Sequence, residues 1–251
     1  MTLSAIIIAK NEEKIIGDCL RSVRQLADEV IVIDDCSEDK TAKIAEKMGA
    51  KVFIHKMEDF AQQREFGLRQ AQGEWALYVD ADERVSEELR DEILEKTKNK
   101  NMKTKNKIVA YKIPRKNFYL GNFEWPMVER IERLFLKKAL KGWRGAIHET
   151  PIVEGKIGEL ENFLLHYTHQ DLSSMVKKTN EWSEIEAKIL YEANHPQMTW
   201  WRFLRVMLTK FWDSYIGQGG WRIGTPGLIE SIYQAFSYFI IYTKLWEKQQ
   251  K

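Results

Sequence analysis

Acidic side chains gather at the end of an apolar, strand-like run in the first third of the chain. The run reads WALYVDADE over residues 75–83 and includes Asp80, Asp82 and Glu83. Residues i and i+2 of a strand point to the same side, so Asp80 and Asp82 could face one hollow beyond the strand. Such carboxylates repel one another unless a cation neutralises them, and oxygen ligands suit Mg²⁺ or Mn²⁺. Capping of a helix that begins near Ser86 explains the acids equally well.

Two further strand-like runs also end in polar residues. EVIVID ends in Asp34 and is followed by Asp35, and LSAIIIA is followed closely by Asn11 and Glu12. Helix capping explains Ser37 in the next turn, but not the adjacent acids at the strand edge. Open α/β sheets bind ligands outside the carboxyl ends of their strands, so the sequence predicts one polar pocket there.

The elements that must position these residues alternate from residue 3 to about 95. Short apolar runs at 3–9, 29–34, 51–54 and 74–80 are each followed by apolar residues at helical spacing. Four such repeats predict a parallel sheet covered by helices. After the lysine-rich polar stretch 95–107, runs within 108–122, 133–138 and 162–169 predict a mixed, partly antiparallel extension of the sheet. The segment 142–151 reads as a loop.

The last eighty or so residues predict helices rich in aromatic side chains. From residue 200 onward, these apolar residues fall on one helical face: Trp200, Leu204, Met207, Leu208, Phe211 and Tyr215. Such a helix suits the headgroup region of a membrane, with Arg202, Arg205 and Lys210 meeting anionic lipid. It could equally pack on the catalytic domain or on a second subunit. We favour the membrane, and we expect a catalytic domain over 1–170 and a helical extension for membrane or subunit contact over 171–251.

Composition excludes several classes of protein. The 251 residues carry a formal net charge of only +2, which argues against a nucleic-acid-coating protein. Two cysteines, Cys19 and Cys36, cannot form a disulfide framework, so we expect a reducing cytoplasm. The N-terminal apolar run lacks the features of a signal peptide, and no uninterrupted run reaches the ~18–20 apolar residues of a membrane-spanning helix.

The motifs together resemble a known family. SAIIIAKNEEKIIGDCLRSV, DEVIVIDDCSEDKTAKIA and QREFGLRQAQGEWALYVDADE resemble the nucleotide-sugar-binding half of family 2 glycosyltransferases with the GT-A fold, over about residues 3–95. GAIHE, LLHYTH and YTKLWE are similar to the lipopolysaccharide-core β-1,4-glucosyltransferase subgroup. The resemblance implies a Rossmann-like mixed sheet and metal-dependent, inverting transfer of a sugar from a UDP-linked donor. It also implies a lipid-linked or cell-envelope glycan acceptor, at the inner face of the cell membrane.

The same resemblance assigns roles to the nucleotide end of the site. Ala9, Asn11 and Glu12 would line the uridine, and Asp35 would hydrogen-bond the base. Arg64 would lie near the pyrophosphate or brace the acidic motif. One departure is a cysteine at position 36, where the family commonly has glycine after the acidic pair.

The sugar end of the site receives the remaining assignments. Asp80 and Asp82 would form the D-x-D pair, with Asp82 the more direct ligand of Mg²⁺ or Mn²⁺. An inverting enzyme needs a carboxylate to accept the proton of the attacking hydroxyl. Glu149 in GAIHE is our candidate, although a surface-loop carboxylate is the competing interpretation. His148 could be a third metal ligand, a substrate contact or an ordinary packed histidine.

Other candidates carry weaker signals. Arg133 is a candidate phosphate contact of the nucleotide sugar, as is Arg130. His166 and His169 alternate in LLHYTH and could form a metal pair, although a packed position is the commoner outcome for such residues.

Two other functions fit parts of the pattern. A sugar-nucleotide nucleotidylyltransferase would also use carboxylate-bound magnesium, but it needs a glycine-rich basic loop after the first strand. That position holds KNEEK, which has no glycine and two acids. A non-catalytic, membrane-associated scaffold with the same fold would show no metal-dependent response to UDP or a UDP-sugar.

Overall fold

The computed structural model describes residues 2–98, 108–145 and 149–251, arranged as two compact units. The first unit contains residues 1–116 and 129–166, and the second contains 117–128 and 167–251. The boundaries fall after Lys116 within one strand and after His166 within another.

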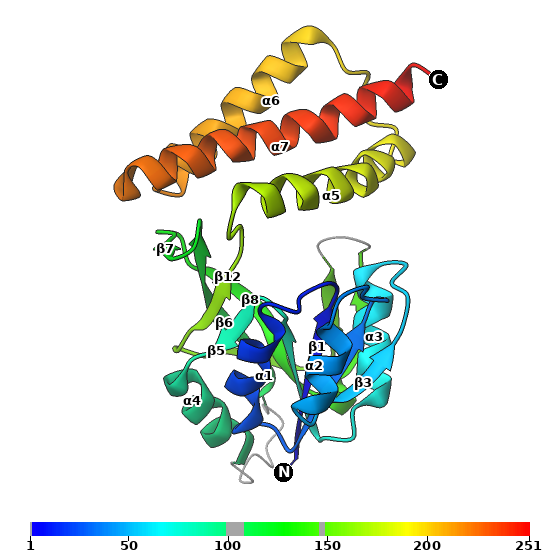
Figure 1. The fold of residues 1–251 in the computed structure, drawn as a ribbon, viewed down its shortest axis with the longest axis vertical. Helices are drawn as coiled ribbons and strands as arrows, with labels where there is room; N and C mark the ends of the chain where they lie inside the picture. The colour runs from blue at the N-terminus through cyan, green and yellow to red at the C-terminus, as the bar shows by residue number, and fades with distance from the viewer. Residues whose placement is uncertain (1, 99–107, 146–148) are drawn as a thin grey trace. The chain divides into compact units, whose positions relative to one another are not determined.

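The first unit opens with alternating strands and helices (Figure 1). In chain order these are β1 (Leu3–Ala9), α1 (Ile16–Arg24), β2 (Glu29–Asp34), α2 (Thr41–Lys47), β3 (Lys51–Ile54), α3 (Phe60–Gln70) and β4 (Trp75–Asp80). β1 pairs in parallel with β2 and with β4, and β2 pairs in parallel with β3. The predicted parallel arrangement of these four strands is therefore confirmed.

Antiparallel strands complete the sheet, which is mixed as predicted. The elements that follow are β5 (Glu83–Val85), α4 (Glu87–Lys98), β6 (Ile108–Tyr119), β8 (Glu129–Leu136), β11 (Lys156–Glu159) and β12 (Leu164–Tyr167). The strand order is β3-β2-β1-β4-β8-β6-β12-β5, and β11 pairs in parallel with β6. β8 is antiparallel to both β4 and β6, and β12 is antiparallel to β5.

The segment predicted as a loop over 142–151 contributes instead to two strands. After a short 3₁₀ helix, η1 (Lys137–Ala139), the strands β9 (Leu140–Arg144) and β10 (Thr150–Val153) pair antiparallel as a second, two-stranded sheet. Leu140 and Trp143 of β9 are buried in a hydrophobic core with residues of β1 and β4. This burial favours a strand where glycines and charged residues hide the sequence pattern.

Two hydrophobic cores lie on the two faces of the sheet. Neighbouring residues Ile6 and Ile7 of β1 point to opposite faces, and they fall into different cores. The core around Ile7 includes Ile16 and Leu20 of α1, whereas the core around Ile6 includes Ala61 of α3. Helices therefore cover both faces, which explains why β1 is apolar at every position except Ser4 instead of alternating.

The second unit is mainly helical. β7 (Phe123–Glu124) pairs with Phe118 and Tyr119, and the helices are α5 (Leu172–Glu192), α6 (Trp200–Trp212), the π-helical η2 (Asp213–Gly217), the 3₁₀ helix η3 (Gly220–Ile223) and α7 (Thr225–Gln249). Figure 1 shows α7 between α5 and α6. Ala187, Met198 and Leu245 form a small core among them. Among the described residues, no helix combines the length and apolar character needed to span a bilayer.

Candidate active site

The parallel strands bring the predicted site residues to one edge of the sheet. Along β1, Ala9 is in register with Asp34 of β2, and Ile8 is in register with Asp80 of β4. The carboxyl ends of β1, β2 and β4 therefore lie side by side. The polar residues that follow each strand begin at this edge, where open α/β sheets place their ligands.

Asp80 is held by two arginines from different elements. Its Oδ1 lies 3.2 Å from Nη2 of Arg64 in α3, and its Oδ2 lies 2.6 Å from Nη2 of Arg133 in β8. Burial alone would raise the pKa of the Asp80 carboxyl, but Arg133 and Arg64 outweigh this and hold that pKa well below its usual range. Asp80 is therefore ionised and fixed in position by its partners.

Glu83 fixes the same strand end, a role that the sequence interpretation did not assign to it. Its side chain is fully buried, and its Oε2 accepts a hydrogen bond of 2.9 Å from the backbone nitrogen of Asp80. Its Oε1 lies 3.0 Å from Nη1 of Arg115, which also pairs with Glu129. Glu83 therefore fixes the backbone at the end of β4. The close spacing of Asp80, Asp82 and Glu83 was the feature of the sequence that could have indicated this role.

Arg64 contacts both Asp80 and Glu149, the predicted general base. Its Nε donates to Oε1 of Glu149 at 2.6 Å, and its guanidinium lies 5.4 Å from the ring centroid of Tyr78 and 5.2 Å from that of Trp143. Burial would lower the pKa of Arg64, but the charges of Asp80 and Glu149 raise it. Within the described part of the chain, its buried Nη1 has no hydrogen-bond partner.

Asp82 lies beside a histidine of β12. Its Oδ2 is 3.4 Å from Nε2 of His166, and only 15% of each side chain is exposed. Burial opposes the charged form of His166, but Asp82 outweighs it and raises the pKa of the imidazole. His148, the third predicted metal ligand, lies outside the described residues. Over 2–98, 108–145 and 149–251, no three His, Cys, Asp or Glu side chains form a group able to hold a metal.

The two histidines of LLHYTH have separate carboxylate partners. His166 pairs with Asp82 in the first unit. His169 belongs to the second unit, where its Nδ1 lies 3.1 Å from Oε1 of the buried Glu230. Each histidine therefore packs beside its own acidic residue, which is the packed position that the sequence analysis gave as the commoner outcome.

Asp35 is buried at the end of β2 with both carboxylate oxygens engaged. Its Oδ1 accepts a hydrogen bond of 2.8 Å from the backbone nitrogen of Met57. Its Oδ2 lies 2.8 Å from Nζ of Lys10, and its own backbone nitrogen donates to the carbonyl oxygen of Ala9 at 2.9 Å. Ala9 and Asp35 therefore lie together. Lys10 places a cation beside Asp35, a contact that the sequence analysis did not predict.

Asn11 and Glu12 connect the turn after β1 to the turn after β2. The backbone nitrogen of Asn11 donates to Oγ of Ser37, and its Oδ1 accepts from the backbone nitrogen of Glu38, each at 2.8 Å. The backbone nitrogen of Glu12 donates to Oγ1 of Thr41 at 2.8 Å. These contacts join the two turns that the sequence assigned to the nucleotide.

The backbone at Cys36 adopts a conformation that favours glycine. The residue has φ = 49°, in the left-handed region that glycine adopts without steric cost. Its thiol is exposed, and the neighbouring Asp34 still accepts a hydrogen bond of 2.8 Å from the backbone nitrogen of Ser37. The cysteine therefore preserves the turn and the acids, at a cost in backbone strain.

Arg130 and Arg133 differ in their positions. Arg133 is 7% exposed and pairs with Asp80, as described above. Arg130 pairs with Glu159 at 3.2 Å, and both of these side chains are more than half exposed. Of the two arginines, only Arg133 belongs to the acidic cluster.

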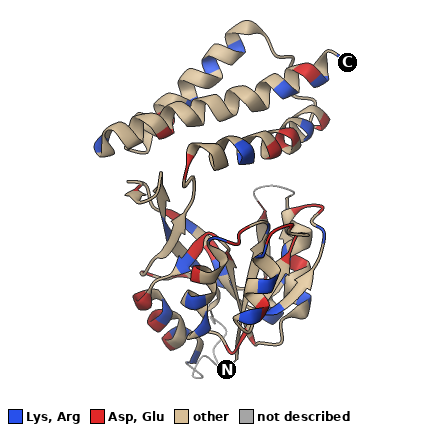
Figure 2. Cartoon of the chain, in the orientation of Figure 1, with Lys and Arg blue, Asp and Glu red and all other residues tan. Residues whose placement is uncertain are grey.

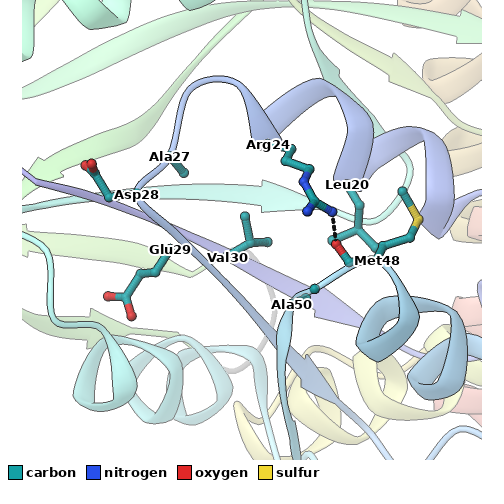
Figure 3. Close-up of a pocket in the computed structure, with 9 residues that line it drawn as sticks. Leu20, Arg24, Ala27, Asp28, Glu29, Val30, Met48 and Ala50 are labelled. Carbon is teal, nitrogen blue, oxygen red and sulfur yellow. Dashed lines mark hydrogen bonds between the residues drawn. The ribbon is translucent and has the colours of Figure 1, made fainter.

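A separate cavity of about 250 Å³ lies at the opposite ends of the strands. Its lining includes Asp28 and Glu29 at the start of β2, Ala50 just before β3, and Arg24, which donates to the carbonyl oxygen of Met48 (Figure 3). None of the predicted site residues lines it. The cavity is therefore distinct from the candidate site at the carboxyl edge.

Comparison with known proteins gives consistent matches. The family model described as glycosyl transferase family 2 matches residues 4–149. An uncharacterised glycosyltransferase of Rickettsia conorii is 31% identical over 99% of this chain and 91% of its own length. The lipopolysaccharide core biosynthesis glycosyltransferase LpsC of Rhizobium meliloti is 27% identical over 99% of this chain and 93% of its own length. The crystal structure of S. aureus TarS in complex with UDP-GlcNAc is similar over 100% of this chain and 92% of the TarS chain. The TM-score is 0.48 and the sequence identity is 15%.

Proposed function

The chain belongs to glycosyl transferase family 2 and has the GT-A fold, and from this membership we propose a metal-dependent, inverting transfer of a sugar. The donor is a nucleotide sugar, with UDP as its nucleotide. The acceptor is a lipid-linked or cell-envelope glycan, a class consistent with the name of the similar LpsC. We expect the enzyme to work in the cytoplasm, at the inner face of the cell membrane where such an acceptor would lie.

One observation carries the proposal. Arg64 pairs with Asp80 at the end of β4 and with Glu149, which is far away in sequence. A carboxylate suited to proton transfer therefore lies beside the acidic motif. A nucleotide sugar whose diphosphate approached Asp80 and Asp82 would place its sugar near Glu149.

The nucleotide end follows from the two connected turns. We assign Ala9, Asn11 and Glu12 to the uridine and Asp35 to the base. In the resting protein Asp35 is paired with Lys10 and with the backbone of Met57, so base binding would exchange one of these contacts. Lys10 is 54% exposed and is the partner that can move at lower cost.

The residues present fit a divalent cation that arrives with the donor diphosphate. Mg²⁺ in nucleotide sites is commonly held by one or two carboxylates together with substrate phosphates and water. Asp82, whose Oδ2 lies beside His166, can supply one such carboxylate, whereas the two oxygens of Asp80 pair with Arg64 and Arg133. A bound cation would stabilise the negative charge that develops on the departing diphosphate. Asp80 would then act through Arg64 and Arg133, two cations that can themselves contact phosphate.

Glu149 is the proposed general base. Its carboxylate would take the proton from the acceptor hydroxyl as that oxygen attacks the anomeric carbon, while the bond to the diphosphate breaks on the opposite face. Arg64 holds Oε1 of Glu149 and so fixes the direction of the carboxylate. Among the described residues the buried Nη1 of Arg64 has no hydrogen-bond partner, so it could donate to the diphosphate when the donor binds.

One observation and one experiment separate the competing functions. Family membership favours glycosyl transfer over a sugar-nucleotide nucleotidylyltransferase. A non-catalytic scaffold would give neither hydrolysis nor a metal-dependent thermal shift with UDP. The helical extension serves membrane or subunit contact in this proposal.

The test is hydrolysis of a panel of nucleotide sugars with Mn²⁺ or Mg²⁺ and without acceptor. We expect turnover of one donor, loss of that turnover with a chelator, and its return when the metal is restored. Asp82→Asn should abolish the metal-dependent thermal shift with UDP, whereas Asp91→Asn on the surface of α4 should keep it. Unchanged hydrolysis in the presence of the chelator would refute the metal dependence.

A further inference from the structure

Helix α6 packs Phe203 against Phe239 of α7 but leaves a second apolar stripe exposed. None of its residues is buried. Large apolar side chains recur along its exposed side and into η2: Trp200, Trp201, Leu204, Leu208, Trp212 and Ile216. Trp200 is 76% exposed, Leu208 68% and Trp212 64%. A surface helix of a globular protein normally turns its apolar stripe to the core, so this stripe calls for a partner outside the described chain.

Cations accompany this stripe along α6, and the nearest acid in the sequence is the exposed Asp213 of η2. α6 contains Arg202, Arg205 and Lys210 and no Asp or Glu, and Figure 2 shows only blue and tan along it. The guanidinium groups of Arg202 and Arg205 lie 5.2 and 5.3 Å from the ring centroid of Trp201. The partner must therefore accept both apolar side chains and positive charge.

The same combination recurs in η3 of the same unit. Trp221 is 52% exposed, and the guanidinium of Arg222 lies 5.5 Å from its ring centroid. Tryptophan beside arginine is typical of the headgroup level of a bilayer, where the ring meets acyl chains and the cation meets phosphate. Residues of α6 and η3 thus present one kind of surface chemistry.

Charge argues for lipid over a second copy of the chain. A two-fold symmetric contact through α6 would bring its cations close to those of the partner helix, with no acid in α6 to compensate them. An anionic bilayer supplies what this surface lacks, because its phosphates carry negative charge and its acyl region accepts the tryptophan and leucine side chains.

We propose that the exposed side of α6, together with Trp221 and Arg222, is a docking surface for anionic phospholipid. The tryptophans and leucines enter the headgroup and upper acyl region, and the arginines contact lipid phosphate. This inference deepens the proposed peripheral location by naming the residues and the lipid class. It rests on the proposed function only through the lipid-linked acceptor.

The test is sedimentation of the full-length protein with phosphatidylcholine vesicles that contain or lack phosphatidylglycerol. We expect binding only to the anionic vesicles, with a blue shift of tryptophan fluorescence. Leu208→Asp should weaken binding about tenfold or more, because it places a charge in the apolar stripe. Arg202→Gln with Arg205→Gln should weaken it about 25-fold, at about fivefold for each cation.

The matched control is Leu172→Asp, which makes the same change at a 61% exposed leucine at the start of α5. It should bind vesicles like the unaltered protein. Equal binding by Leu208→Asp and Leu172→Asp, or no binding of the unaltered protein to anionic vesicles, overturns the proposal. A dimer in analytical ultracentrifugation that Leu208→Asp converts to monomer would do so too, by assigning the surface to a subunit contact.

Thermal unfolding and donor hydrolysis without acceptor are measured on every variant. A variant that unfolds at the unaltered temperature has lost only its surface chemistry. Hydrolysis that persists when vesicle binding is lost separates this inference from the proposed function. Absent hydrolysis in a protein that binds vesicles would count against the proposed function alone.

Discussion

Asp80 and Glu149 are held by the same guanidinium. Arg64 places its Nη2 3.2 Å from Oδ1 of Asp80 and its Nε 2.6 Å from Oε1 of Glu149. The rings of Tyr78 and Trp143 lie against this guanidinium and limit its movement. The distance between the carboxyl end of β4 and the proposed general base therefore depends on one buried arginine.

Replacing the proposed base should separate binding from transfer. Glu149→Gln keeps the shape of the side chain and its contact with Arg64, but removes the proton acceptor. We expect transfer to fall by about 10²–10⁴-fold, with binding of UDP nearly unchanged. Transfer rates and the thermal shift with UDP measure the two effects. Glu154→Gln, at an exposed carboxylate paired with Lys141, is the matched control. Loss of UDP binding in Glu149→Gln would reverse the assigned division of roles.

A lysine in place of Arg64 should be a poor substitute. Its ammonium is a compact charge, so it cannot bridge Asp80 and Glu149 or stack on two rings as a planar guanidinium does. We expect a loss of about 3 kcal/mol in the free energy of unfolding, together with slower transfer, because one buried carboxylate loses its partner. Denaturant unfolding measures the first effect. Arg69→Lys, at an exposed position of α3, should change neither quantity. Equal stability of the two variants would contradict the bridging role.

Glu29 should make the protein sensitive to acid. Burial would raise the pKa of its carboxyl, but hydrogen bonds from Lys51, Ser4 and the backbone of Gln72 lower it from 4.5 to about 2. Its stabilising contribution is complete above its ordinary pKa and is lost as the pH falls through about 2. The difference between the two pKa values corresponds to at most about 3 kcal/mol of the free energy of unfolding.

Glu29→Gln should therefore lower the free energy of unfolding at pH 7 and reduce its loss between pH 7 and pH 3. Denaturant unfolding at both values measures this difference. Glu46→Gln, on the exposed side of α2, should leave the pH dependence as it is in the unaltered protein. A difference between Glu29→Gln and the unaltered protein that stays constant with pH would show that Glu29 is not the acid-sensitive group.

The backbone at Cys36 should be relieved by glycine. At φ = 49° the steric cost of the left-handed conformation is about 1–2 kcal/mol for an L-residue. For glycine this steric cost is small, but glycine loses more conformational entropy on folding. We expect Cys36→Gly to change the free energy of unfolding by no more than about 1 kcal/mol, with stabilisation favoured, and Cys36→Val to destabilise the protein. Thermal unfolding ranks the variants, and Cys36→Ala controls for loss of the thiol. A valine variant as stable as the glycine variant would argue against strain at this turn.

The strand β9 could not be predicted from local sequence patterns. Gly142 and Arg144 interrupt the apolar character that identifies a strand, so 142–151 reads as a loop. The strand forms because Leu140 and Trp143 enter a core built mainly from β1, β2 and β4. That burial depends on segments distant in sequence, and local spacing does not record it. The C-terminal helices were predictable because helical spacing is local.

The sequence by itself determined the class of the fold, the four parallel strands with their helices, and the meeting of polar residues after β1, β2 and β4. Continuous apolar runs identify buried strands, and parallel strands place their carboxyl ends together. Only the tertiary structure decided which side chains pair there: Arg133 with Asp80, Arg64 with Glu149, and His166 with Asp82. These contacts depend on the antiparallel register of β8 and β12 and on the β9–β10 sheet. Register between distant strands is set by packing of the whole core, which no short stretch of sequence contains.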